Sequence, residues 1–166
     1  MTPLQLAKGI KSFLEDRMAH YDEEYTFGEQ FDSEGEYIED IKKIGVYTLR
    51  LPIVKTAAER RSLSPSIVIR PYEVRDEEDQ TVVKVFVAVT VHDSETEAGA
   101  EVIYHLVEFI RHELLAHNPV GMKWNIRNGS MITTIPDEQP YPEWWGIVDF
   151  EVNIPQPEWT PPGVFD

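Results

Sequence analysis

Two histidines close together in the sequence are the first candidates for catalytic chemistry. His112-Glu113-Leu114-Leu115-Ala116-His117 is close in composition to the H-E-x-x-H motif, in which two histidines bind zinc and the glutamate acts as a base. That motif needs histidines four residues apart, on one helical face. Here they are five apart, so a regular helix turns them by about 140° from each other. This spacing excludes a shared metal ion.

Two other groups of residues invite comparison with metal sites. Glu101, His105, Glu108 and His112 follow each other at helical spacings of three and four, and nitrogen and carboxylate ligands suit a divalent metal. A metal-dependent hydrolase is therefore one alternative, and a solvent-facing stripe of Glu and His side chains is the other. Asp32-Ser33-Glu34-Gly35-Glu36 differs from a calcium loop, because its glycine comes too early and no bidentate Glu follows.

No other catalytic motif is present. The chain has no P-loop, no G-x-G-x-x-G, no G-x-S-x-G and no cysteine nucleophile. Carboxylates are abundant, but the sequence gives none of them a special environment. The motifs therefore assign no catalytic residue, no cofactor and no bound metal, and the metal-dependent hydrolase stays open as an alternative.

The clearest structural pattern runs from Ser66 to His117. Valines alternate along residues 81–91, as on one face of a half-buried strand, and residues 67–74 form a second β-rich run. The polar link at 75–80 predicts a hairpin loop, and Pro71 predicts a bulge or an edge. From Glu97 to His117 the apolar residues recur at helical spacing. The pattern predicts a hairpin whose valine face is covered by an amphipathic helix.

The remaining elements are predicted by shorter signals. Thr2-Pro3 begins an amphipathic helix that extends to about His20. We expect a loop or poorly formed hairpin from residue 22 to 40. Strands are expected at 44–54, at 122–127 and 131–135 around the Asn128-Gly129 turn, and at 144–154. A long loop, the kind of segment that is often functional, should span 55–66.

Together these elements predict an α+β fold. We expect a small, mostly antiparallel β-sheet with about two amphipathic helices packed on one face. Residues 1–154 should form a single domain, because a chain of 166 residues is short for two domains that each have a hydrophobic core. Residues 155–166 hold four prolines and should form an extended C-terminal arm.

Charge is strongly segregated along the chain. The net charge is −15, with eleven carboxylates and one Lys or Arg, Arg17, between residues 15 and 40. Residues 42–75 reverse this, with eight Lys or Arg and two carboxylates, and no Lys or Arg follows Arg127. Separate acidic and basic regions favour head-to-tail pairing of identical chains. Solubility alone is the simpler explanation, and an acidic adaptor that mimics DNA and occupies a basic partner is a third.

Contacts between subunits or with partners are predicted at exposed cations and aromatic residues. The strand face opposite the valines is neither polar nor fully apolar, so a neighbouring subunit could cover it. The candidates are Arg60, Arg61, Lys84, Phe86, Trp144, Trp145 and Trp159. No apolar run approaches the roughly 20 residues that cross a bilayer, and no signal peptide is visible. We expect a soluble protein made in the cytoplasm, without a membrane partner.

Several short phrases, in a fixed order, resemble the tail terminator or tail completion proteins of tailed bacteriophages and prophages. They are Ser66-Ile67-Val68-Ile69-Arg70-Pro71, the acidic link, the Val-rich strand ending in Val91-His92-Asp93, the helix to His117, Gln139-Pro140-Tyr141-Pro142-Glu143-Trp144-Trp145-Gly146, and Ile154-Pro155-Gln156-Pro157. The likeness covers roughly residues 66–157 and the N-terminal helix. Between Tyr25 and Val54 the chain is longer than that pattern.

The resemblance implies a structural virion protein. Such a protein is not an enzyme and has no catalytic residues to carry over. It assembles as a homo-oligomeric ring, a hexamer by analogy, in the host bacterial cytoplasm. The ring caps the tail tube, ends its polymerisation and docks the tail to the head connector protein. The implied partners are copies of itself, the tail tube protein, the connector, and DNA that only passes through an acidic lumen.

Overall fold

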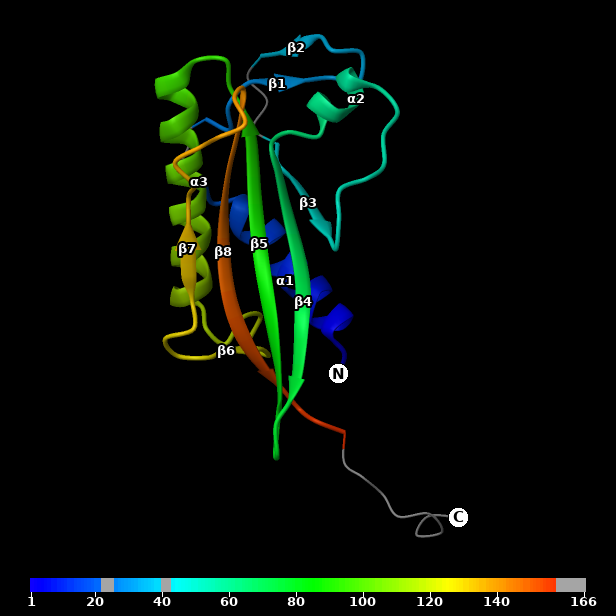
Figure 1. Cartoon of the computed structure of the whole chain (residues 1–166), viewed down its shortest axis with the longest axis vertical. Coiled ribbons are helices and arrows are strands. Elements are labelled where there is room, and N and C mark those ends of the chain that lie inside the picture. Colours follow the sequence, from blue (N-terminus) through cyan, green and yellow to red (C-terminus); the bar gives the residue numbers. More distant parts are fainter. Residues whose placement is uncertain (22–25, 40–42, 158–166) are drawn as a thin grey trace.

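The computed structural model describes residues 1–21, 26–39 and 43–157, and the α+β class is confirmed. Figure 1 shows a six-stranded mixed sheet, a separate two-stranded sheet at one end, and the helices. The elements are α1 (Pro3–Met18), β1 (Gln30–Phe31), β2 (Tyr37–Ile38), β3 (Gly45–Thr48), α2 (Ala57–Ser62), β4 (Ser66–Asp76), β5 (Thr81–His92), α3 (Thr96–Ala116), β6 (Asn125–Ile126), β7 (Ile132–Thr134) and β8 (Glu143–Ile154).

Strand β5 is the centre of the large sheet. The strand order is β3-β4-β5-β8-β6, and β7 also pairs with β8. Every pair is antiparallel except β3 with β4, which is parallel. The register between β4 and β5 shifts between Pro71 and Glu73, which confirms the bulge expected from the proline.

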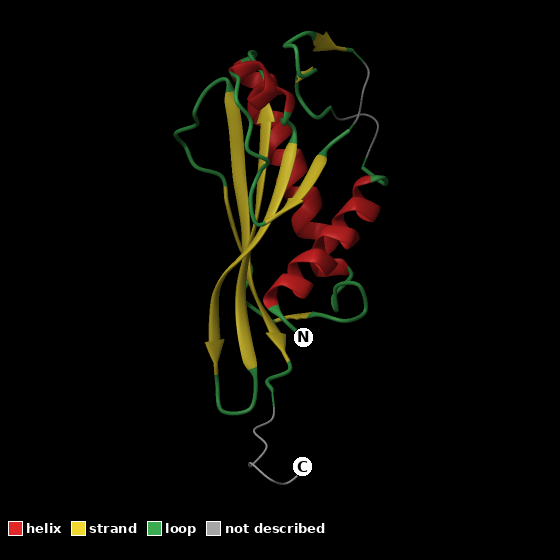
Figure 2. Ribbon diagram, turned by 90° about the vertical axis from the view of Figure 1, so that its right-hand side faces the viewer, coloured by secondary structure: helices red, strands yellow, loops and turns green. Residues whose placement is uncertain are grey.

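Both long helices cover the same face of this sheet. Figure 2 shows α1 and α3 on one side and the bare sheet on the other. The predicted valine face lies under them: Val83, Val85, Val87, Val89 and Val91 are fully buried, together with apolar residues of both helices and of β8. Buried apolar area of this kind is the main stabilising term in a domain of this size. The hairpin-plus-helix prediction is confirmed.

Helix α1 begins where the sequence predicts. The Thr2 side chain accepts a hydrogen bond from the Gln5 amide, and the Gln5 side chain accepts one from the Thr2 amide, which completes a capping box. Pro3 occupies the first turn, where no backbone donor is needed. Farther along, Gly9 lets the Trp124 ring pack directly against the helix: a Cβ at Gly9 would lie 1.8 Å from the ring.

Three predicted segments are wrong in detail. The strand expected at 44–54 spans only Gly45–Thr48. The expected loop at 55–66 contains α2, whose N-cap is Thr56. The strands expected around the Asn128-Gly129 turn do not pair with each other, because β6 and β7 each pair with β8 along the same edge.

The segment between α1 and β3 forms a small hairpin where it is described. Strands β1 and β2 pair through Gln30 with Ile38 and Phe31 with Tyr37. The Asp32 carboxylate accepts hydrogen bonds from the amides of Glu34 and Glu36, so it shapes the turn. The hairpin alternative is confirmed. Most of the predicted C-terminal arm, residues 158–166, lies outside the described residues.

Candidate functional surface

The sheet face opposite the helices brings several predicted contact residues together. Residues that are directly paired across strands share a face, so the register places one outward set together. We call this set the open sheet face. It consists of Val68, Arg70, Phe86, Ala88, Thr90, Ile132, Thr134, Trp145, Ile147 and Asp149, all of which are half-buried or exposed.

The open sheet face is apolar in its middle. Ala88 lies between Val68 on β4 and Ile147 on β8, and Phe86 lies one pair farther along. On the neighbouring strand β7, Ile132 is 64% exposed. Burial of such an apolar cluster against another surface is favourable, because it removes apolar area from water.

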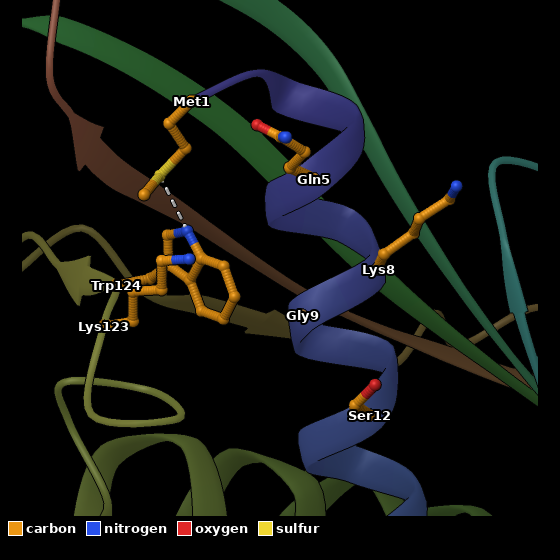
Figure 3. Close-up of a pocket in the computed structure, with 7 residues that line it drawn as sticks. All are labelled: Met1, Gln5, Lys8, Gly9, Ser12, Lys123 and Trp124. Atoms are coloured by element: carbon orange, nitrogen blue, oxygen red, sulfur yellow. Dashed lines mark hydrogen bonds between the residues drawn. The ribbon is translucent and has the colours of Figure 1, made fainter.

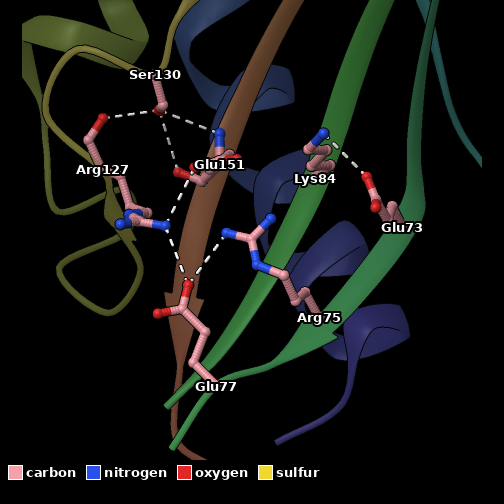
Figure 4. Close-up of polar contacts among 7 residues, drawn as sticks. All are labelled: Glu73, Arg75, Glu77, Lys84, Arg127, Ser130 and Glu151. Atoms are coloured by element: carbon pink, nitrogen blue, oxygen red, sulfur yellow. Dashed lines mark hydrogen bonds and ion pairs between the residues drawn. The ribbon is translucent and has the colours of Figure 1, made fainter. Parts of the chain in front are cut away.

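Charged residues occupy the end of this face near the β4–β5 turn, and they pair with one another (Figure 4). Lys84 Nζ lies 3.0 Å from Glu73 Oε2, and Arg127 Nη1 lies 3.3 to 3.4 Å from Glu151 and Glu77. Ser130 completes the cluster by accepting the Glu151 amide at 3.1 Å. The charges within this cluster neutralise one another, whereas Glu78 and Asp79 in the adjacent β4–β5 turn are exposed and form no ion pair among the described residues.

Tyr72 lies at the boundary between the apolar and the charged parts. Its hydroxyl donates to both carboxylate oxygens of Asp149, at 2.7 and 2.9 Å, and its ring lies 5.7 Å from that of Phe86. Partial burial and the Asp149 carboxylate raise the pKa of Tyr72 to about 12. The contact fixes the Tyr72 side chain across three strands, so this part of the surface is pre-arranged.

The opposite end of the face is covered by β1 and α2. The Phe31 ring packs edge-on against His92 at 5.1 Å, and the Arg61 guanidinium lies 5.1 Å over the Phe31 ring. Ser64 donates to Glu143 at 3.2 Å. Burial raises the pKa of Glu143, although His92, Ser64 and Arg61 act in the opposite direction. Arg61 therefore marks the border of the open sheet face at this end.

The structure brings four of the seven predicted contact residues to this surface. Lys84, Phe86 and Trp145 point to the open side, and Arg61 lies at its border. Arg60 is on the same short helix, exposed and without an ion pair among the described residues.

One of the seven predicted positions lies in the core, and another is outside the described residues. Trp144 is in the core: it is 8% exposed, and its indole N–H donates to the Asp93 carbonyl at 3.0 Å, which corrects the expectation of a surface residue. Trp159 lies outside the described residues.

Several residues of the open sheet face were not among the contact residues predicted from the sequence. Arg70, Ile132 and Ile147 join Phe86 only through the pairing of β4, β7 and β8. A signal for Ile147 existed, because it alternates with Asp149 and Glu151 along one strand. No sequence signal places Ile132 beside them.

The histidine stripe on α3 has the geometry of a solvent-facing surface. Glu101, His105, Glu108 and His112 are all exposed, while His117 contacts Glu113 through its Nδ1 at 3.2 Å. Among residues 1–21, 26–39 and 43–157, no group of three or more His, Asp or Glu side chains is arranged to hold a metal ion. The geometry gives the hydrolase alternative no support.

Asp93 follows β5, and the ionisation of its buried carboxylate should make the stability of the fold depend on pH. Its carboxylate accepts the Glu95 amide at 2.9 Å, and burial, with the nearby Glu29 carboxylate, raises its pKa. The folded state therefore binds this proton more readily than the unfolded state, so stability is lost as the pH rises through the raised pKa. Asp93→Asn keeps the acceptor and removes the charge. We expect thermal melts to show the variant gaining stability relative to the natural chain between pH 4 and pH 7.

A pH-independent difference in melting temperature between Asp93→Asn and the natural chain would contradict this assignment. Glu97→Gln is the matched control, because Glu97 lies in the exposed first turn of α3. Its melting temperature should follow that of the natural chain at both pH values.

Among the described residues, no helix is both long enough and apolar enough to span a bilayer. The sequence matches no protein-family model, and a search of curated proteins gives no match either.

Proposed function

We propose that this protein is a structural component of a phage or prophage tail, which assembles as a ring of identical subunits and terminates the tail tube. The open sheet face is the observation that carries the proposal. A bare, half-apolar sheet face, bordered by paired charges at one end and by Arg60 and Arg61 at the other, is a surface suited to contact with another subunit.

The distribution of charge supports the same proposal. Arg60 and Arg61 lie beside the open sheet face on α2, whereas the exposed side of α3 carries Glu97, Glu101 and Glu108. Contact between unlike surfaces produces a ring when the rotation between copies closes. A hexamer is the ring size that the resemblance implies, and the tail tube protein and the head connector are the partners it implies.

Sedimentation velocity and light scattering of the purified chain test the proposal directly. We expect a closed oligomer at micromolar concentration and binding to a tail tube protein in a pull-down. A chain that stays monomeric at high concentration and does not bind tube protein would overturn the proposal. Tight, salt-sensitive capture by a nucleic-acid-binding protein would instead favour the DNA-mimic alternative.

Substitutions on the open sheet face should weaken assembly without unfolding the chain. Ala88→Lys places a charge in the half-buried middle of the face, and Arg60→Glu with Arg61→Glu reverses its border. We expect each change to raise the dissociation constant for self-association by at least about 100-fold, the size of an interface hot spot. Sedimentation velocity gives the constant, and far-UV circular dichroism checks the fold.

Glu15→Lys on the exposed side of α1, away from both the open sheet face and the acidic side of α3, serves as a control for the change of charge. The oligomer should tolerate it better than Ala88→Lys if the open sheet face carries the contact. Equal effects at both positions would show that net charge controls assembly and would count against this face.

A further inference from the structure

The outward side of α3 carries large apolar residues among its charges. Residues spaced by three and four lie along one line of this helix, and we call them the outer α3 stripe: Glu97, Glu101, Tyr104, Glu108, Arg111 and Leu115. Tyr104 is 60% exposed and Leu115 is 47% exposed, so two large apolar side chains of the stripe face water. Aromatic residues are enriched where one protein surface binds another.

The outer α3 stripe begins with negative charge and continues without net charge. Glu97 and Glu101 are exposed, and neither forms an ion pair among the described residues. Farther along, Glu108 pairs with Arg111 at 2.8 Å, so this part of the stripe is neutral. The open sheet face has the complementary arrangement, with the arginines of α2 at one border and an apolar middle.

The outer α3 stripe cannot cover the open sheet face of its own chain. Figure 2 shows α3 on one side of the sheet, and the open sheet face is on the other side. Helix α3 packs against β5 and β8, the strands whose outward residues Phe86, Ala88 and Ile147 form the apolar middle of that face. A second copy that stacks with its helices against the bare sheet can therefore set its α3 over these same two strands.

The two surfaces also agree in length. At about 1.5 Å per residue, Tyr104 and Leu115 are about 16 Å apart along the axis of α3. On the open sheet face, Trp145 and Phe86 are four residue pairs apart, which is about 13 Å at roughly 3.3 Å per residue. Both apolar residues of the stripe can therefore contact the apolar part of the face at once, with Tyr104 toward Trp145 and Leu115 toward Phe86.

Charge favours one of the two directions in which a second copy could stack. Helix α3 begins at the same end of the subunit as α2, at the top of Figure 1, and the β4–β5 turn lies at the opposite end. When both copies point the same way, the acidic start of the stripe approaches Arg60 and Arg61. When one copy is reversed, it approaches the exposed carboxylates of Glu78 and Asp79, and like charges repel. Copies that share one direction are related by rotation about an axis roughly parallel to β5, as in a ring.

Helix α1, the other long helix on the covered face, is a poorer occupant of the open sheet face. It packs against β3 and β4, away from the apolar middle. Its first three turns expose the polar residues Gln5, Lys8 and Ser12 beside an open hollow of about 510 Å³, and Figure 3 shows Lys8 extended away from Trp124. This part of α1 has a positive charge and no negative one, so it complements the arginines of α2 poorly.

We propose that the outer α3 stripe of one copy covers the open sheet face of the next copy, with the acidic start of α3 beside Arg60 and Arg61. This inference rests on the self-assembly proposed above and names the surface that the open sheet face binds. It also gives the ring a direction, because every copy points the same way and β5 runs roughly along the ring axis.

Disulfide trapping between single-cysteine variants tests this contact, because the natural chain contains no cysteine. Ala88→Cys is in the middle of the open sheet face, and Glu108→Cys is in the middle of the outer α3 stripe. The two variants are purified separately, mixed, dissociated, reassembled and oxidised. We expect at least about tenfold more disulfide-linked dimer in the mixture than in either variant alone, because only close Cα atoms can be bridged.

A mixture of Ala88→Cys with Glu15→Cys is the control for this trapping. Glu15 is exposed on α1, so this mixture should show no such excess of linked dimer. A disulfide that forms between two Ala88→Cys chains would mean that two open sheet faces pair with each other, and it would overturn the inference. An oligomer in which Ala88→Cys and Glu108→Cys do not link would overturn it as well.

Charge exchange between the two surfaces supplies a second arm of the experiment. Glu97→Arg with Glu101→Arg should raise the dissociation constant for self-association by at least about tenfold. The chain that combines these changes with Arg60→Glu and Arg61→Glu should associate more tightly than a chain with either pair of changes alone. Sedimentation velocity gives the constants, and circular dichroism checks the fold of each variant.

Glu15→Arg with Asp16→Arg is the matched control on α1, and it should leave the dissociation constant unchanged. An oligomer that persists while the combined variant shows no rescue would overturn the assignment of α3 alone. A natural chain that stays monomeric at every concentration would overturn the ring as well.

Discussion

Gly99→Ala is expected to lower the free energy of unfolding by about 2 to 4 kcal/mol, even though alanine is the better helix former. A Cβ at position 99 would lie 2.2 Å from Nε1 of Trp144. Trp144 is buried and cannot move without losing its hydrogen bond to the Asp93 carbonyl. Overpacking and an orphaned donor each cost about 1 to 3 kcal/mol, which exceeds the gain in helix propensity of about 1 kcal/mol. Urea denaturation followed by circular dichroism measures the change.

A double-mutant cycle with Trp144→Phe separates the contact from other effects of Gly99→Ala. Phenylalanine is smaller and has no N–H group, so alanine at position 99 should cost at least about 1 kcal/mol less in that background. The same loss of stability in both backgrounds would mean that Trp144 is not what requires glycine at this position.

Glu113→Ala is expected to cost about 2 to 3 kcal/mol of stability. Glu113 is a buried residue of α3, and its Oε2 lies 2.6 Å from Nε of Arg17 on α1 and 3.2 Å from Nδ1 of His117. Removing the carboxylate leaves the partly buried Arg17 guanidinium without its partner, and an unpaired buried charge is costly. Some solvent reaches Arg17, so the expected loss lies below that of a fully buried pair. Glu113→Gln should lose less, since the amide oxygen still accepts.

Glu108→Ala is the matched control for Glu113→Ala. Glu108 is in the same helix and pairs with Arg111 at 2.8 Å, but its side chain is 65% exposed, compared with 11% for Glu113. An exposed pair three residues apart contributes less than about 0.5 kcal/mol. Similar losses for the two alanine variants would show that the contact between helices does not stabilise the fold.

Much of the fold follows from local periodicity. The alternating valines and the helical spacing after Glu97 predict a strand and a helix, because burial on one side determines both patterns. The contact between Arg17 and Glu113 joins residues 96 positions apart, and nothing in either sequence neighbourhood indicates it. Helix α2 could have been predicted: Thr56 and Glu59 have capping-box spacing, and the Thr56 hydroxyl accepts the Glu59 amide.

The part of the candidate surface that lies on a single strand could be predicted from the alternation of residues along that strand. Lys84 and Phe86 follow from alternation along β5. The same argument applied to β8 would have separated the two adjacent tryptophans, because Trp144 is in phase with Val148 and Phe150, whereas Trp145 is in phase with Ile147. The residues that β4 and β7 add to this surface could not be predicted in the same way. Their place depends on the order of strands in the sheet, and that order is set by pairing between distant segments.

The second half of β4 has no strand paired to its outer edge, which affects how copies of this chain can associate. Strand β3 pairs only as far as Ile69, so within the described chain the outer edge from Arg70 to Asp76 has no neighbouring strand. Such an edge usually invites another strand to add and extend into fibrils. Here Pro71 lacks a donor, the bulge after it disrupts the register, and charged side chains follow. The edge is therefore a poor template for strand addition, and this part of the sheet should resist amyloid-like growth even where the sheet face itself contacts another molecule.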